Sequence, residues 1–210
     1  EGADFSALKK LGVAAETRML RATGGINTHR GAIFSLGLLC AAAGRLHALG
    51  LAPSASNLRK QLLAGWGEQL AAHTHAEGDQ SHGSCVATAH GASGARHEGA
   101  LGLPSVFGTG LGTMQSTLAA GRGLRLARID ALFALMAQVS DTNVIHRGGI
   151  AGAQIVRRHA RDFMANGATA APQWEAQALA CHQLFMAQNL SPGGAADLLA
   201  ASCFVLAFCA

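Results

Sequence analysis

Two segments of the chain carry the same set of side chains, an Asn, a His and an Arg followed by glycine. The first is Asn27-Thr28-His29-Arg30-Gly31, and the second is Asn143-Val144-Ile145-His146-Arg147-Gly148-Gly149. Each glycine opens an apolar stretch that predicts a helix, and the free N–H groups at a helix N-terminus attract phosphate. A neighbouring arginine can bind a phosphate through two parallel hydrogen bonds. The two segments indicate a ligand with several phosphates, although Asn and Thr could also simply cap two helices.

The composition favours helices over sheets. Half of the 210 residues are apolar, 13% are charged, and tyrosine is absent. Ala and Leu are strong helix formers, whereas the β-branched and aromatic residues typical of strands are scarce. The net charge of +4 comes mainly from arginine. Because there is no lysine-rich run, we do not expect the chain to bind nucleic acid.

The cysteines and the apolar runs indicate a soluble cytoplasmic protein. Five cysteines are odd in number and form no C-x-x-C pair, and most lie among apolar residues, as buried free thiols do. This pattern predicts a reducing compartment without a disulfide framework. The apolar runs 31–44 and 198–210 are shorter than the roughly 20 residues that a bilayer span needs. We therefore expect no membrane span.

Helical periodicity covers most of the chain and predicts an all-α, multi-helix bundle that forms one domain over residues 1–210. Helices are expected over 4–21, 31–47, from just after Ser54 to about His73, and over 114–121, 126–139, 149–165, 173–189 and 192–208. In the last of these, Ser191 is the expected N-cap and Pro192 the first helical residue. From His75 to Thr113 no period survives, which predicts one long irregular loop rich in His and Gly.

That loop contains two patterns that resemble known sites without matching them. His73, His75, His82, His90, His97 and Cys85 are potential zinc ligands, but their spacings match no known zinc arrangement. The glycine run Phe107-Gly108-Thr109-Gly110-Leu111-Gly112 resembles a dinucleotide-binding loop but lacks the strands that such a loop needs. We expect a turn leading into a helix there. The sequence also lacks a nucleophile elbow and a P-loop.

Further polar groups interrupt the apolar chain at Arg96, Glu98, Asp141 and Ser191-Pro192-Gly193-Gly194 with Asp197. Arginines can bind phosphates, carboxylates can transfer protons or hold a metal, and histidines titrate near neutrality. Each group also has a purely structural interpretation. Asp141 could cap the turn that follows it, Asp197 could favour its helix dipole, and Arg96 with Glu98 could be an exposed ion pair.

These motifs, in this order along essentially the whole chain, resemble those of the triphosphoribosyl-dephospho-CoA synthases. The segments are Thr23-Gly24-Gly25-Ile26-Asn27-Thr28-His29-Arg30-Gly31-Ala32-Ile33-Phe34, then Gly94-Ala95-Arg96 with Glu98, Ala100 and Leu103-Pro104-Ser105-Val106, then Asp141-Thr142-Asn143 with Arg147-Gly148-Gly149, and finally Ser191-Pro192-Gly193-Gly194-Ala195-Ala196-Asp197-Leu198-Leu199-Ala200.

The resemblance implies an all-helical enzyme that joins ATP to 3′-dephospho-CoA with loss of adenine. Its product would be the precursor of the prosthetic group on the acyl carrier protein of citrate lyase or malonate decarboxylase. The motif that contains Asn143 and His146 is more similar to that of the family members that serve malonate decarboxylase. The sequence departs from the family pattern by lacking a Pro-Gly-Leu-Val-Asp-like and a Gly-Ala-His-x-Asp-Met-like segment, so we expect that the family's N-terminal portion is missing. His97 also stands where relatives often have Gly.

For such a reaction, a carboxylate must take the hydroxyl proton or stabilise positive charge at C1′, and an acid must protonate adenine. Glu98 and Asp141 are the candidates for the first role, and His29 or His146 for the second. The remaining candidates would bind substrate and phosphates: Asn27, Arg30, Gly31, Arg96, Asn143, Arg147, Gly148, Gly149, Gly193, Gly194 and Asp197. Mg²⁺ is expected with the triphosphate, with Asp141 as its candidate ligand.

Two other functions fit the same residues. A non-catalytic helical module could bind nucleotide at the same phosphate sites. A helical scaffold could use the polar groups only as caps and turns.

Overall fold

The computed structural model describes residues 4–74 and 94–210, and all regular structure in these two ranges is helical. The prediction of an all-α protein is confirmed. The elements are α1 (Phe5–Ala22), α2 (Arg30–Ala48), α3 (Ala55–Thr74), α5 (Ala95–Ala100), the π-helix η1 (Ser105–Gly110), α6 (Leu111–Ala119), α7 (Gly123–Gln138), α8 (Thr142–Ala165), the 3₁₀ turn η2 (Ala168–Ala170), α9 (Trp174–Ala187) and α10 (Gly193–Phe208).

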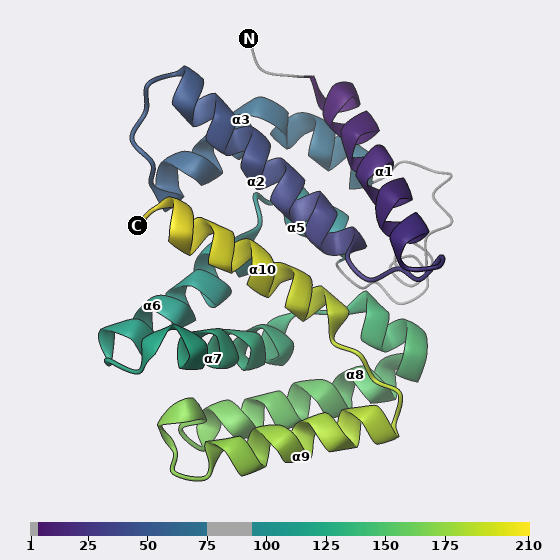
Figure 1. The fold of residues 1–210 in the computed structure, drawn as a ribbon, viewed down its shortest axis with the longest axis vertical. Coiled ribbons are helices and arrows are strands. Elements are labelled where there is room, and N and C mark those ends of the chain that lie inside the picture. The colour runs from purple at the N-terminus through teal and green to yellow at the C-terminus, as the bar shows by residue number, and fades with distance from the viewer. Residues whose placement is uncertain (1–3, 75–93) are drawn as a thin grey trace.

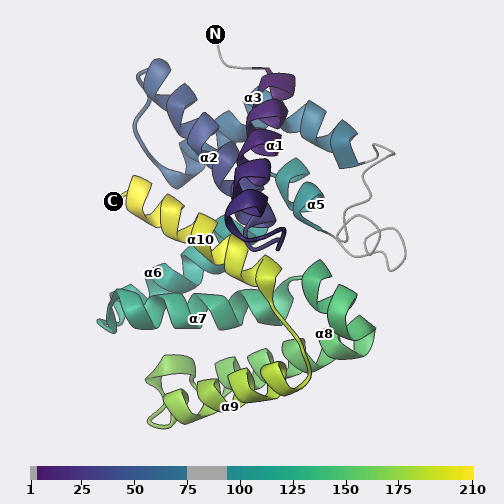
Figure 2. The same ribbon diagram turned by 45° about the vertical axis from the view of Figure 1, so that its right-hand side comes forward.

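The last helix, α10, crosses the middle of the molecule. Figure 1 shows α1, α2, α3 and α5 on one side of it and α6 to α9 on the other, and Figure 2 shows the same division after a 45° turn. Helix α10 packs directly against α2 on one side and against α7 and η1 on the other. The C-terminal motif is thereby carried into the interior, between the two halves of the chain.

Helix α2 buries one face, with buried residues three or four positions apart. Leu38, Leu39, Ala42 and Leu46 are fully or nearly fully buried, and this spacing places them on one face of a helix. By length and composition, α2 is the one described helix that could cross a membrane. Here it packs against α1, α3 and α10. A core helix of a folded protein can have the same length and apolar composition as a membrane-spanning helix.

The predicted irregular loop is wrong in its second half. Residues 94–113 contain α5, η1 and the start of α6. The sequence pattern does not predict these elements, because α5 is too short to show a period and a π-helix does not follow the 3.6-residue repeat. The glycine run leads into α6, as expected, but through the π-helix η1 and not through a turn. Residues 75–93, with His75, His82, Cys85 and His90, lie outside the described residues.

The predicted helix over 149–165 corresponds to the second part of α8, which begins at Thr142 and is kinked at Gly149. Gly149 interrupts this helix with φ of 62° and ψ of −166°, a backbone conformation that side chains with a Cβ rarely adopt. Figure 1 shows the resulting change of direction within α8. The second Asn-His-Arg segment therefore lies in the first part of α8, directly in front of the part that follows Gly149.

Candidate functional site

Three helices, α2, α8 and α10, begin close to one another, and two aspartates connect their N-terminal ends. Asp141 precedes α8 and binds the first turn of α10. Asp197, the fifth residue of α10, lies against Gly31 at the start of α2. We call the group formed by Gly31, Asp141, Asn143, Gly194 and Asp197 the helix junction.

Asp141 caps two helices at once. Its Oδ1 accepts hydrogen bonds from the N–H groups of Asn143, at 2.9 Å, and Val144, at 3.4 Å. Its Oδ2 accepts one from the N–H of Ala195, at 3.0 Å. Only 7% of the residue is exposed. The expectation that Ser191 caps α10 is wrong, because the helix begins at Gly193 without a side-chain cap of its own and Asp141 supplies the acceptor from a distant segment.

Asp197 connects α10 to α2 in a similar way. Backbone N–H groups of Ala32 and Gly31 donate hydrogen bonds to its carboxylate. The helix dipole of α2 also favours a negative charge at this position. Part of the N-terminus that the sequence offers to a phosphate is thus already bound to a carboxylate of the protein.

The junction is tight enough to require glycine at several positions. A Cβ on Gly31 would overlap the carboxylate of Asp197, and a Cβ on Gly193 would lie 2.7 Å from Nδ2 of Asn143. At Gly194 a Cβ would lie 3.1 Å from the carboxylate of Asp141. The glycines of the first and last motifs therefore allow the three helix ends to approach one another.

Replacing Gly31 by alanine is expected to lower the free energy of unfolding by about 1–3 kcal/mol, because the new methyl group must displace Asp197. Gly37→Ala, on the same helix, is the matched control, since a Cβ there meets nothing within 4 Å. The control should gain about 0.5–1 kcal/mol from helix propensity. Urea unfolding of the two variants measures the difference, and equal stabilities would contradict this packing.

Burial makes both carboxyl groups weaker acids than usual. It raises the pKa of Asp141 above its ordinary value, against the opposing effect of its backbone hydrogen bonds. Burial, together with the nearby charge of Asp141, raises the pKa of Asp197 to about 6, while the backbone of Ala32 and the charge of His29 oppose that rise. A carboxyl group that titrates near neutrality can exchange protons at physiological pH.

The raised pKa of Asp197 predicts a pH-dependent stability. Between about pH 4 and pH 6 the folded protein holds a proton that the unfolded chain has lost, so the free energy of unfolding falls as the pH rises through this window. We expect a loss of about 1–2 kcal/mol, because the group is partly solvated and the full value is not reached. Asp197→Asn should remove this component. Parallel pH profiles for the two proteins, measured by urea unfolding at pH 4.5 and 7.5, would contradict it.

The first Asn-His-Arg segment borders the junction. Oδ1 of Asn27 accepts a hydrogen bond from the N–H of Arg30 at 3.1 Å, and Nδ1 of His29 lies 2.7 Å from Oγ1 of Thr28. The guanidinium group of Arg30 forms an ion pair with Glu16 on α1. Its Nε–H is buried and has no hydrogen-bond partner among the described residues, which leaves one charged donor without an acceptor beside the junction.

The second segment is only partly at the junction. Asn143 lies against Gly193, but His146 and Arg147 are exposed on α8, and Arg147 donates to Oδ1 of Asn189 at 3.1 Å. Gly148 has a packing role, because a Cβ there would overlap the side chain of Leu190. The structure therefore separates Arg147, Gly148 and Gly149 from the tightly packed helix ends.

The carboxylate of Glu98 on α5 is bound to Ser105 and not to the junction aspartates. The hydroxyl of Ser105 donates to it at 2.5 Å and the Ser105 N–H at 3.2 Å. Arg96 is half-buried on the same helix. Helix α5 nevertheless begins next to α8, because a Cβ on Gly94 would lie 3.5 Å from the side chain of Thr142.

Two interactions of the candidate residues were not predicted from the sequence. Glu16 on α1 was not among the candidate residues, and it forms an ion pair with Arg30. Ser105 belongs to one of the family motifs but was given no role, and its hydroxyl binds Glu98. The described residues contain no group of three or more His, Cys, Asp or Glu side chains that could hold a metal ion. Because three N–H groups also surround Asp141, the residues do not fit a Mg²⁺ site built by the protein alone.

Comparison with known proteins shows the family to which the chain belongs. A family model described as ATP:dephospho-CoA triphosphoribosyl transferase matches residues 1–209. A protein of Pseudomonas fluorescens, named probable 2-(5''-triphosphoribosyl)-3'-dephosphocoenzyme-A synthase, is 42% identical over 196 residues, which are 93% of this chain and 66% of that protein.

Proteins with the same name in Pseudomonas putida and Acinetobacter calcoaceticus are 40% and 34% identical to the chain. These matches cover 95% and 96% of this chain, and 69% of each relative. The chain thus spans about two thirds of the length of the curated relatives that it matches. No solved structure matches it.

Proposed function

Since the chain belongs to the ATP:dephospho-CoA triphosphoribosyl transferase family, we propose that it carries the centre that joins ATP to 3′-dephospho-CoA. In this reaction the 2′-hydroxyl of dephospho-CoA attacks C1′ of the ATP ribose. The bond from C1′ to adenine breaks, the hydroxyl proton passes to a base, and adenine leaves with a proton from an acid. The triphosphate remains on the transferred ribose.

One observation carries the proposal: three family motifs that are far apart in the sequence meet at the helix junction. The Asn27–Gly31, Asp141–Asn143 and Gly193–Asp197 segments come together through Asp141 and Asp197. A scaffold needs caps at each helix end, but it does not need two carboxyl groups whose pKa values are raised by burial, one of which also raises the pKa of the other. That arrangement is typical of sites that transfer protons.

Asp197 is the best placed base at the junction. Its pKa of about 6 keeps it mostly ionised at neutral pH while leaving it basic enough to accept a proton. Asp141 is less suited to proton transfer, since three backbone N–H groups already bind its oxygens. Its role in this proposal is to position Asp197 and α10. Glu98 is a poorer candidate for the base, because its hydrogen bond with Ser105 would first have to break.

His29 is the candidate acid for the leaving adenine, because its charge already acts on Asp197 across the start of α2. An imidazole has the pKa range that this step needs. The guanidinium of Arg30, with an unpaired Nε–H, would bind phosphate oxygens near α2. His146 and Arg147 would lie farther along the triphosphate or the second substrate.

Mg²⁺ would enter with the nucleotide, since its usual ligands in such sites are phosphate oxygens, water and few carboxylates. We place the reaction in the cytoplasm, where ATP is available and the unpaired thiols of Cys40, Cys181, Cys203 and Cys209 stay reduced. The product would enter prosthetic-group assembly for an acyl carrier protein, with malonate decarboxylase favoured over citrate lyase by Asn143 and His146.

Release of free adenine tests this function. The chain is incubated with MgATP, with dephospho-CoA, or with both, and adenine is measured by chromatography. We expect adenine only when both substrates are present. Saturable ATP binding without adenine release would instead support a non-catalytic nucleotide-binding module, and no binding of either substrate would support a scaffold.

A further inference from the structure

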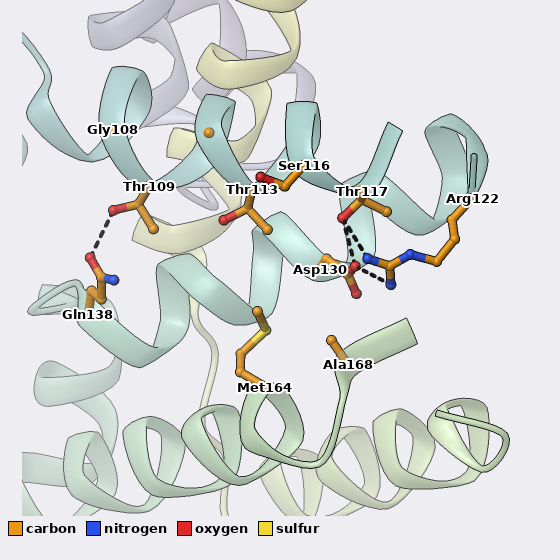
Figure 3. A pocket seen from close by; sticks show the side chains of 11 residues that line it. Gly108, Thr109, Thr113, Ser116, Thr117, Arg122, Asp130, Gln138, Met164 and Ala168 are labelled. Atoms are coloured by element: carbon orange, nitrogen blue, oxygen red, sulfur yellow. Dashed lines mark hydrogen bonds and ion pairs between the residues drawn. The ribbon is translucent and has the colours of Figure 1, made fainter. Parts of the chain in front are cut away.

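An open hollow of about 500 Å³ lies outside the junction, between η1 and α6 on one side and α7, α8 and η2 on the other. Figure 3 shows that hydroxyl groups line one wall, where Thr109, Thr113, Ser116 and Thr117 follow one another along η1 and α6. The thioether of Met164 lies opposite. The volume is within the range of small-molecule sites.

The charged residues of the hollow neutralise each other. Asp130 is 1% exposed and forms a 2.9 Å ion pair with Arg122. The hydroxyl of Thr117 donates to the same carboxylate at 2.8 Å, and the N–H of Thr169 donates at 2.9 Å. This closed network leaves no net charge for an ionic ligand. It holds α6, α7 and η2 together and so fixes the shape of the hollow.

The remaining polar groups are available to an uncharged ligand. Within the described part of the chain, no hydrogen bond reaches the hydroxyls of Thr113 and Ser116, whereas Thr109 donates to Gln138 at 2.8 Å. The wall between these groups has no side chain, because Gly108 and Gly112 line the hollow and a Cβ on either would meet nothing within 4 Å. Donors, acceptors, open backbone and a thioether together suit a neutral chain with amide and hydroxyl groups.

One end of the hollow lies near the helix junction. Gln138 lines the hollow and ends α7, and Asp141 follows three residues later. Three residues of extended chain span at most about 11 Å. A ligand that reacts at the junction could therefore place a long substituent in the hollow.

We propose that this hollow binds the pantetheine arm of dephospho-CoA, a flexible and uncharged chain with two amides and a hydroxyl. The inference rests on the proposed function, because dephospho-CoA is the second substrate there. The nucleotide portion of that substrate would lie at the junction, and the arm would extend along α6 past Gly112.

The test compares the affinities of dephospho-CoA and ADP, which differ essentially by the arm, in the 210-residue chain under reducing conditions. Calorimetry should give a dissociation constant about tenfold or more lower for dephospho-CoA. Gly112→Trp should reduce this ratio to within about twofold by filling the hollow, without loss of helix propensity. Gly44→Trp is the matched control, since Gly44 is also helical, has open space around its Cβ, and does not line the hollow.

Thr113→Val is the second variant and removes one unpaired hydroxyl while conserving side-chain volume. It should weaken the binding of dephospho-CoA by roughly threefold to tenfold and leave the affinity for ADP unchanged. If dephospho-CoA keeps its advantage over ADP in both variants, the arm lies elsewhere and this inference is overturned, while the proposed function stands. If the chain binds neither ligand, both proposals are overturned.

Discussion

Asp141→Ala is expected to lower the free energy of unfolding by about 3–5 kcal/mol. The substitution removes the acceptor for three backbone N–H groups at the starts of α8 and α10, and it leaves buried donors unpaired. Asp141→Asn should also lose about 1–3 kcal/mol, because an amide has only one acceptor atom and would direct its NH₂ group at a backbone donor.

Asp4→Ala is the matched control, since Asp4 caps only α1, through a 2.6 Å bond from the N–H of Ala7, and is exposed. It should cost about 0.5–1 kcal/mol. Urea unfolding monitored by circular dichroism measures all three variants. A cost for Asp141→Ala no larger than that for Asp4→Ala would contradict the double cap.

Asp197→Asn is expected to reduce the turnover of ATP and dephospho-CoA by about 10²-fold or more, the usual effect of removing a positioned proton acceptor. The variant keeps the size of the side chain and one acceptor atom for the α2 backbone, so it should still fold and bind ATP. Asp162→Asn, an exposed aspartate in the last turn of α8, should be fully active.

The pH profile separates a base from a purely structural aspartate. A base acts only when ionised, so kcat/KM of the unaltered chain should fall about tenfold per pH unit below the Asp197 pKa of about 6. Asp197→Asn should show low activity without this slope. A variant that keeps both the activity and the slope would move the role of base to another carboxyl group.

Much of the fold was predictable because helical periodicity and composition act locally. The helix over 31–47 was expected where α2 lies, and the segments from α6 to α10 were expected in the right order, with several ends displaced. The short α5 and the π-helix η1 were not predicted, since neither shows a 3.6-residue repeat.

The partners of the candidate residues depend on contacts between segments far apart in the chain. Asp141 reads as an ordinary N-cap, and only the fold reveals that Ala195, 54 positions away, donates to it. Gly31 was interpreted as part of a phosphate site, while the structure shows that it makes room for Asp197. Asn27 was correctly expected at a helix start. This contact is local, because the N–H of Arg30, only three positions away, donates to Oδ1 of Asn27.

The most direct test of the central claim follows the terminal phosphate of ATP. The chain is incubated with dephospho-CoA and ATP labelled at the γ-phosphate, and the products are separated by chromatography and identified by mass. The account predicts that the label appears in a dephospho-CoA product that has gained an intact triphosphoribosyl group, in a one-to-one ratio with free adenine. Label found only in free phosphate, in pyrophosphate or in unreacted ATP would contradict it.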